Sequence, residues 1–235
     1  MTAAPPPARA PGPAVPAGVA LVEGPLAAVT EQLGTPLPDQ LRAAFHRVPR
    51  HLFLPDRVWL RDGAGGYAPC DQSAEPERWL ATAYADEPLV TQFTDGLPSS
   101  SASMPSMVAR TLLLTGLTPL SEPAGAAEAD GERVPKLGAG TGFNAGLLCA
   151  LLGEGSVTTI EVDPVLAGQA EENLKTAGYA PLVVREDAAD GAAGSGPCYR
   201  ILATFSVDHI PPAWPAQVRP GGRIVTPWTS AWCRY

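Results

Sequence analysis

The chain has 235 residues, of which 45% are hydrophobic, and this is enough to bury the core of one sizeable domain with an appendage. Its formal net charge is −8 and no cluster of Lys and Arg is present, so the composition argues against a nucleic acid partner. No segment approaches the ~20 continuous apolar residues of a membrane span, which argues against a membrane partner as well.

The first residues lack the charged start and apolar run of a secretory signal, so we expect a cytoplasmic protein. The cysteines show no metal-type spacing, and we therefore expect free thiols in a reducing compartment and no metal site. The four are Cys70, Cys149, Cys198 and Cys233.

Residues 1–38 are rich in proline and poor in apolar mass, so we predict that this region is largely disordered. A helix is predicted over 39–48, because Leu41, Ala44, Phe45 and Val48 fall on one helical face. Asp39 is placed to cap its start, and the proline at 49 ends it.

Residues 61–76 are glycine-rich and polar, which predicts a loop. A second helix is predicted to begin at Pro105, with Ser103 as its cap. Its expected buried face consists of Met107, Val108, Leu112, Leu113 and Leu114. Residues 39–120 are thus predicted to form a helical front segment that carries a substrate loop. A small-residue acidic loop at 125–131 separates this segment from the rest of the chain.

From residue 121 to 235 the pattern alternates between strand and helix. Strands are predicted at 133–137, 156–162, 182–187, 199–204 and 222–227, and helices at 144–152 and 164–177. Strands separated by helical segments are typical of a parallel sheet. We therefore expect an α/β domain with a Rossmann-like sheet and helices on both faces.

A glycine-rich loop joins the first of these strands to its helix. Gly138, Gly140 and Gly142 let the backbone turn tightly and let a ligand approach it. Glu161 lies 19 residues after Gly142, at the end of the next strand, where an acidic residue typically bonds ribose hydroxyls. Asp187 follows the third strand and is placed to reach the same ligand. The G-x-G-x-G spacing favours S-adenosylmethionine over a nicotinamide dinucleotide, and a turn that only packs helix on strand is the remaining alternative.

Six motifs in this order resemble the protein-L-isoaspartate O-methyltransferase family, and in particular its longer actinobacterial-type members. They are VPRHLFLP (48–55), AYADEPL (83–89), SASMPSMVA (101–109), LGAGTGFNA (137–145), IEVDP (160–164) and RPGGRIVTPW (219–228). The resemblance covers about residues 41–227. It implies a Rossmann-like methyltransferase that uses S-adenosylmethionine to methylate a carboxylate, usually that of an L-isoaspartyl residue in a protein or peptide.

The resemblance also implies roles for particular residues. Ser103 would donate a hydrogen bond to the incoming carboxylate or bond its flanking peptide, and Ser101 would help to shape the site. The residues assigned to the cofactor are Gly138, Gly140, Thr141, Gly142, Asn144, Glu161, Val162, Asp187 and Ala188. A carboxylate is already ionised at neutral pH, since its reference pKa is about 4, so this chemistry needs no general base.

The chain departs from the family pattern at several positions. Pro135 stands in a strand expected at the middle of the sheet, where proline cannot donate a ladder hydrogen bond. Lys136 replaces an acidic residue and is expected to face a cationic cofactor, with a repulsion of up to about 4 kcal/mol at an effective dielectric near 20. Tyr199 stands where aspartate is common, and a further strand pair is expected to be missing after Tyr235, which leaves the methyltransferase domain truncated.

Three hypotheses on function follow. The first is carboxyl methylation, either of an isoaspartyl residue in protein repair or of an aspartyl residue in peptide maturation. The second is a degenerate, non-catalytic protein that keeps the fold and binds a peptide partner, which Pro135 and Lys136 favour. The third, a nicotinamide-dependent oxidoreductase, is disfavoured by the glycine spacing.

Overall fold

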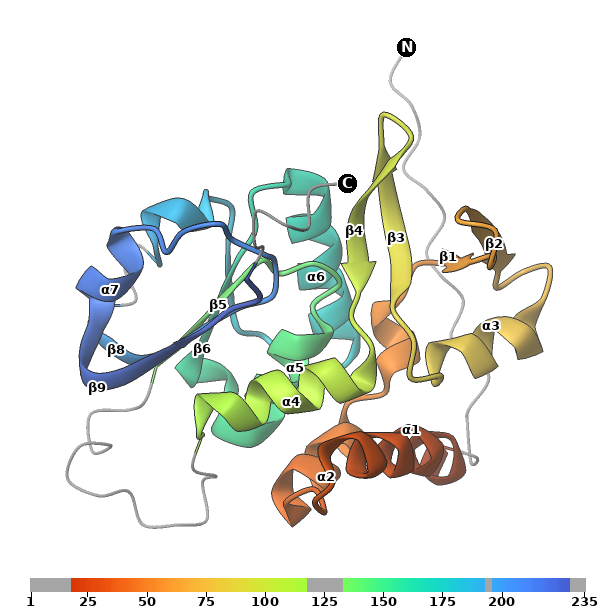
Figure 1. Ribbon diagram of the computed structural model, residues 1–235, viewed down its shortest axis with the longest axis horizontal. Coiled ribbons are helices and arrows are strands. Elements are labelled where there is room, and N and C mark those ends of the chain that lie inside the picture. Colours follow the sequence, from red (N-terminus) through yellow and green to blue (C-terminus); the bar gives the residue numbers. More distant parts are fainter. Residues whose placement is uncertain (1–17, 118–132, 193–195, 229–235) are drawn as a thin grey trace.

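The structure is a computed structural model that describes residues 18–117, 133–192 and 196–228. The first 17 residues, the predicted acidic loop at 125–131, Cys233 and all residues after 228 lie outside the described residues. The division of the chain near residue 120 and the expected loss of a C-terminal strand pair therefore stay predictions. The described strands form two sheets, one parallel with five strands and one antiparallel with four (Figure 1).

The parallel sheet confirms the predicted α/β arrangement. Its strands are β5 (Val134–Leu137), β6 (Val157–Ile160), β7 (Leu182–Val184), β8 (Cys198–Ala203) and β9 (Val218–Val225). They lie in the order β7-β6-β5-β8-β9, and every neighbouring pair is parallel. This order reverses direction at β5, so β5 is the strand from which the sheet grows both ways, as in doubly wound folds.

Helices cover both faces of this sheet. On one face Val134, Val157 and Leu202 join a core with α4 (Pro105–Thr115), α5 (Phe143–Leu152) and α6 (Pro164–Thr176). On the other face Ile160 and Ile201 pack with α7 (Ala213–Gln217) and the short 3-10 helix η3 (Ala188–Asp190). The two cores alternate along each strand because successive side chains of a strand point to opposite faces.

Pro135 fits into the central strand β5 because β5 pairs with its neighbour β8 along only part of its length. The carbonyl of Leu137 accepts the N–H of Thr204, so Leu137 faces the β8 side, and Pro135, two residues earlier, faces the same side. Pairing between β5 and β8 is recorded only at Lys136 and Leu137, whereas β5 pairs with β6 along all four of its residues. The missing proline N–H therefore falls where the ladder to β8 has not yet begun.

The prediction that residues 39–120 form a helical segment is wrong in part, because this segment also contains the antiparallel sheet. Its strands are β1 (Arg57–Arg61), β2 (Tyr67–Asp71), β3 (Leu89–Thr94) and β4 (Leu97–Ala102), in the order β2-β1-β3-β4. β2 lies inside the predicted loop 61–76, and α3 (Pro76–Ala83) begins at its end. Buried Val58 and Cys70 hold the β1–β2 hairpin on the core, and the carboxylate of Asp62 accepts two N–H groups of its turn.

The prediction of disorder over residues 1–38 is wrong for 18–33, which form α1 (Gly18–Leu33). Val22, Leu26 and Val29 are buried at helical spacing, and α1 packs on α4 and α2 (Figure 1). The apolar stripe therefore prevails over the single proline inside the helix, Pro25.

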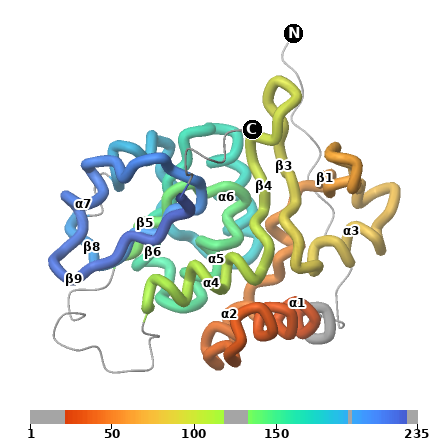
Figure 2. The backbone as a smooth tube through the Cα atoms, viewed as in Figure 1, coloured from red at the N-terminus to blue at the C-terminus, as the bar shows by residue number. Residues whose placement is uncertain are grey.

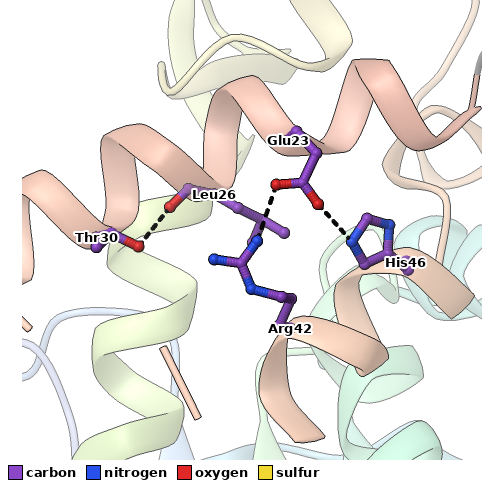
Figure 3. A network of polar contacts seen from close by, with 5 residues as sticks. All are labelled: Glu23, Leu26, Thr30, Arg42 and His46. Carbon is purple, nitrogen blue, oxygen red and sulfur yellow. Dashed lines mark hydrogen bonds and ion pairs between the residues drawn. The ribbon is translucent and has the colours of Figure 1, made fainter. Parts of the chain in front are cut away.

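The helix α2 (Asp39–Arg47) confirms the prediction for residues 39–48, but Asp39 does not cap it. Glu23 of α1 binds two residues of α2, through oxygens that lie 2.8 Å from a nitrogen of Arg42 and 2.9 Å from Nε2 of His46 (Figure 3). These contacts are at the surface, so they orient the two helices more than they stabilise them.

The N-cap predicted for α4 is also wrong. The Ser103 side chain makes no cap bond, and Oδ1 of Asp86 instead accepts the N–H of Ser106 at 2.7 Å. The buried face of α4 contains Val108 and Leu112, as predicted, whereas Met107 and Leu114 are exposed. A cap that comes from a residue 20 positions earlier cannot be found from local spacing.

Arg50, in the 3-10 helix η1 (Arg50–Phe53), fastens the end of β4 to the core. Its buried guanidinium donates to five backbone carbonyls, those of Ala83, Ala85, Glu87, Ala102 and Ser103. Burial lowers the pKa of Arg50 to about 10, so the group stays charged at neutral pH.

Candidate active site

A cleft of about 580 Å³ lies between the two sheets. This volume is in the range of small-molecule binding sites. Its lining residues come from both sheets, so the cleft has one wall from each sheet. Figure 2 shows the strands β3 and β4 between the parallel sheet and β1. The glycine-loop wall consists of Gly138, Gly140, Ile160, Glu161, Val162, Leu166, Asp187, Ala188, Thr204 and Phe205. The hairpin wall consists of Arg61, Tyr67, Pro88, Val90, Pro98, Ser99, Ser100 and Ser101.

The glycines of the loop have two different roles, since one allows close helix packing and another leaves room for a ligand. Gly142 has φ +90°, and a Cβ there would lie 3.1 Å from the carbonyl oxygen of Ala170 on α6. Gly140 has φ +55°, and a Cβ there would meet nothing within 4 Å. Gly142 is thus needed for helix packing, while Gly140 leaves open space on the side of the cleft.

Glu161 holds the glycine loop in place. Its side chain is buried, Oε2 accepts the N–H of Gly140 at 2.9 Å, and Oε1 accepts the N–H of Asp163 at 3.2 Å. A carboxylate has about four acceptor positions, so two remain for a ligand. Asp187 also lines the cleft, while its Oδ1 accepts the N–H of Ala189. This wall therefore offers two carboxylates to a ligand that carries hydroxyl or amino groups.

Lys136 does not line the cleft, which corrects the expectation that it faces the cofactor. Its buried side chain lies on the sheet face that α4 and α5 cover, and Nζ donates to the carbonyls of Gly138 and Ala139. Burial lowers the pKa of Lys136 to about 7, against the opposing effect of Glu161. The lysine therefore supports the loop from beneath.

The structure brings six of the nine residues assigned to the cofactor to the cleft. These are Gly138, Gly140, Glu161, Val162, Asp187 and Ala188. The other three lie behind the loop: Thr141 is buried and its carbonyl accepts from Asn173, Gly142 packs on α6, and Asn144 is buried in α5. Binding by any of the nine stays a prediction.

Of the two serines assigned to the substrate, only Ser101 lines the cleft. Ser103 lies beyond the end of β4, where its carbonyl accepts from Arg50. The neighbouring Ser99 and Ser100 line the cleft as well, and the serine-rich run is a strand and not a loop. Two hydroxyl bonds join β4 to β3, in which Thr91 donates to Ser100 and Thr94 donates to Ser99.

Sequence reasoning missed Arg61 and Tyr67, which the β1–β2 hairpin places in the hairpin wall. The signal that was present is the alternation of Val58 and Leu60 with polar and aromatic residues, followed by a turn that begins at Asp62. It also missed Thr204 and Phe205, which follow β8 at the carboxyl end of the parallel sheet. In open α/β sheets this end is where ligands bind.

Among residues 18–117, 133–192 and 196–228, no group of three or more His, Cys, Asp or Glu side chains is arranged to hold a metal ion. Within the same ranges, none of the helices has the length and apolar character needed to cross a membrane.

Comparison with known proteins adds a family to this geometry. The family model for protein-L-isoaspartate(D-aspartate) O-methyltransferase matches residues 72–232. The chain is 31% identical to a protein-L-isoaspartate O-methyltransferase of Methanosarcina mazei over 83% of this chain and 65% of the relative. It is 31% identical to that of Methanococcoides burtonii, over 78% and 73% respectively. For that of Anaeromyxobacter dehalogenans the identity is 38%, over 63% of each chain. The chain thus spans about two thirds of the length of these curated relatives.

Two solved structures show the same fold. One, a protein-L-isoaspartate O-methyltransferase, is matched with a TM-score of 0.64 and 27% identity, over 88% of this chain and 55% of that one. The other is a protein of Plasmodium falciparum in complex with S-adenosyl-L-homocysteine, with a TM-score of 0.59 and 15% identity, over 91% and 84%. At this lower identity the second structure supports the fold alone.

Proposed function

Because the chain belongs to the protein-L-isoaspartate(D-aspartate) O-methyltransferase family, we propose that its cleft binds S-adenosylmethionine and methylates the carboxylate of an L-isoaspartyl residue in a protein or peptide. The observation that carries this proposal is the pairing of two walls in one cleft. One wall has a glycine loop with carboxylates, and the other has a row of serine hydroxyls.

The residues of the glycine-loop wall fit the cofactor. Glu161 keeps acceptor positions for ribose hydroxyls, Asp187 adds a second carboxylate, and Gly140 leaves room for a ligand beside the backbone. Trp214 donates to the carbonyl of Ala188 at 2.6 Å and so fixes the far end of this wall. The bound cofactor would supply a methyl group on a positively charged sulfur.

The hairpin wall supplies what the methyl acceptor needs. The acceptor carboxylate is ionised at neutral pH and needs no base, so the contribution of the protein is alignment, which can be worth roughly 7–11 kcal/mol. Ser101 lies on β4 opposite Val90 of β3, and its hydroxyl can donate to one carboxylate oxygen while the other attacks. The family resemblance gives the role of carboxylate donor to Ser103, and we assign it instead to Ser101, which lines the cleft.

The alternative function, a degenerate protein that only binds a peptide, was favoured by Pro135 and Lys136. Both residues are accommodated behind the cleft, in the ladder of β5 and beneath the glycine loop. The reasons to doubt cofactor binding therefore weaken, and the enzymatic function is the better supported one.

The cytoplasmic location is part of this proposal. Its support is that Cys70, Cys149 and Cys198 are free and buried, as in proteins of a reducing compartment.

A direct test combines binding and transfer. S-adenosylhomocysteine, the demethylated product, is titrated by calorimetry, and transfer from S-adenosylmethionine is followed with an isoaspartyl peptide and with the aspartyl peptide of the same sequence. Micromolar binding and methylation of the isoaspartyl peptide are expected. Methylation of only the aspartyl peptide would redirect the proposal to peptide modification, and binding without any transfer would contradict both versions.

A further inference from the structure

Two arginines lie on the same face of β1, and their surroundings differ. Arg57 is opposite Asp71 of β2 and forms an ion pair with it, with 2.8 Å between nitrogen and oxygen. Arg61 is opposite Tyr67, and the centre of its guanidinium lies 5.6 Å from the centre of the tyrosine ring. Only Arg61 lines the cleft.

The guanidinium of Arg61 contacts the ring of Tyr67 and is free to bind an anion. Tyr67 meets Phe93 edge to face with 5.6 Å between ring centroids, and Phe93 meets Trp59 in the same way at 5.2 Å. Arg61 is exposed, and within the described part of the chain no carboxylate forms an ion pair with it. A guanidinium within about 6 Å of a ring centroid is attracted to the ring, and its planar fork of N–H donors matches the geometry of a carboxylate.

The two walls of the cleft carry charges of opposite sign, negative on the glycine-loop wall and positive on the hairpin wall. Glu161 and Asp187 are on the glycine-loop wall, and Arg61 is the one cationic side chain among the described residues that line the cleft. The chain as a whole carries a formal charge of −8, so an acidic peptide is repelled by most of the molecule. Arg61 therefore marks the place in the cleft where a negative group of the peptide is favoured.

The hairpin that carries Arg61 precedes the part of the chain that the family model matches. That match begins at residue 72, and β2 ends at Asp71. The hairpin joins the cleft through pairing of Trp59 with Val90 of β3. Arg61 thus reaches the cleft through the pairing of its hairpin with β3, just before the residues that the family model matches.

We infer that Arg61 is a specificity-determining residue, which binds the carboxylate of an acidic residue that flanks the methylated one in the peptide. The inference rests on the proposed function, because it needs a peptide in the cleft. The acceptor carboxylate itself is the less suitable partner, since two charge-assisted bonds from a guanidinium would draw electron density from both oxygens and make the attacking oxygen a weaker nucleophile. An exposed guanidinium also suits a flanking group at the mouth of the cleft, whereas the acceptor reacts away from water.

The test uses four isoaspartyl peptides of one sequence, in which the residue before or after the acceptor is Glu or Gln. Relative kcat/KM is measured for the wild type and for Arg61→Gln, Arg61→Lys and Arg57→Gln. The wild type is expected to prefer one Glu peptide over its Gln counterpart by about tenfold, as for one charge-assisted hydrogen bond. Arg61→Gln should bring this ratio close to one, because kcat/KM falls much more for the Glu peptide than for the Gln peptide. Arg61→Lys should keep part of the ratio, and Arg57→Gln should keep all of it.

Three outcomes would overturn the inference. The first is a wild type that methylates the Glu and Gln peptides with equal kcat/KM. The second is an equal loss of kcat/KM on both peptides in Arg61→Gln, which would assign Arg61 to the acceptor or to folding. The third is the same loss of preference in Arg57→Gln. The dissociation constants of the peptides, measured with S-adenosylhomocysteine present, separate this inference from the proposed function. If no peptide is methylated, the proposed function fails, while the ratio of the dissociation constants still decides whether Arg61 selects acidic peptides.

Discussion

The two walls of the cleft are built in different ways. The glycine-loop wall is held by buried contacts of the backbone, in which Gly142 packs on α6 and Glu161 accepts two N–H groups. The hairpin wall consists of strands with an exposed side, where serine hydroxyls bond to neighbouring side chains. A change in the buried contacts of the first wall disturbs the core, whereas a change in the exposed serine hydroxyls of the second wall leaves the core packed. The fold thus keeps its proposed cofactor wall fixed and leaves its proposed substrate wall open to variation.

The largest effect is expected where the hairpin wall is fastened to the core. Arg50→Met leaves five backbone carbonyls without their donor, and the free energy of unfolding should fall by more than about 3 kcal/mol. Urea unfolding followed by circular dichroism measures this loss. Arg78→Met is the control, because Arg78 is exposed and its ion pair is with Glu75, the residue just before α3, and it should keep the wild-type midpoint. A tolerated Arg50→Met would show that the carbonyls find water instead.

The next largest effect is expected on the affinity for S-adenosylhomocysteine, which should fall for a change in the glycine-loop wall and not for a change in the hairpin wall. Glu161→Ala removes the acceptor for Gly140 and Asp163, so the affinity for S-adenosylhomocysteine should fall about 100-fold, or about 2.7 kcal/mol. Glu161→Gln keeps one carbonyl oxygen and should lose less. Titration calorimetry measures both, with Ser101→Ala as a control on the opposite wall. Unchanged affinity in Glu161→Ala would mean that the glycine loop is held by other contacts.

A third effect concerns the support of the glycine loop. Burial lowers the pKa of Lys136 from its ordinary value of 10.5 to about 7, and Glu161 is the charged group that opposes this shift. At pH values between these two pKa values, Lys136 binds a proton in the unfolded chain but not in the folded chain. The free energy of unfolding therefore rises with pH over this range. The gain is about 2 kcal/mol from pH 7 to pH 9, since a full proton difference is worth about 1.4 kcal/mol per pH unit.

Denaturant unfolding at several pH values checks this dependence. Lys136→Met should lose the rise between pH 7 and pH 9, and Lys175→Met, which removes an exposed lysine of α6, should keep it. An identical slope in wild type and Lys136→Met would show that Lys136 stays charged in the folded protein.

The sequence predicted the half of the molecule that is buried on both faces of a sheet. Its strands β6 and β7 are short runs without charged residues, and glycine or proline lies at the ends of α5 and α6 (Gly142, Gly153, Pro164 and Gly178), so local signals and tertiary packing agree there. The same agreement brought Gly140 and Glu161 to the cleft as expected. Lys136 was misplaced because the direction of a side chain from a strand depends on which face the helices cover.

The other half could not be predicted to the same extent, because distant contacts decide its structure. Glycines at the turn concealed the strand that carries Tyr67, and the proline content of the first residues concealed the buried stripe of Val22 and Leu26. The start of α4 is capped from Asp86, and β4 exists because β3 pairs with it. Such partners lie too far along the chain for spacing rules.

The smallest effect compares two serines that the sequence could not tell apart. Ser101 lines the cleft, so Ser101→Ala should lower kcat/KM for an isoaspartyl peptide about tenfold, the value of one hydrogen bond to a charged group, with unchanged affinity for S-adenosylhomocysteine. Ser103→Ala should change either quantity less than about twofold, since Ser103 is held through its carbonyl, which any residue provides. Methylation assays with both variants decide the matter. If Ser103→Ala carries the larger loss, the substrate wall must rearrange when the peptide binds, and the bonds of Arg50 to Ala102 and Ser103 are then the contacts that would have to open.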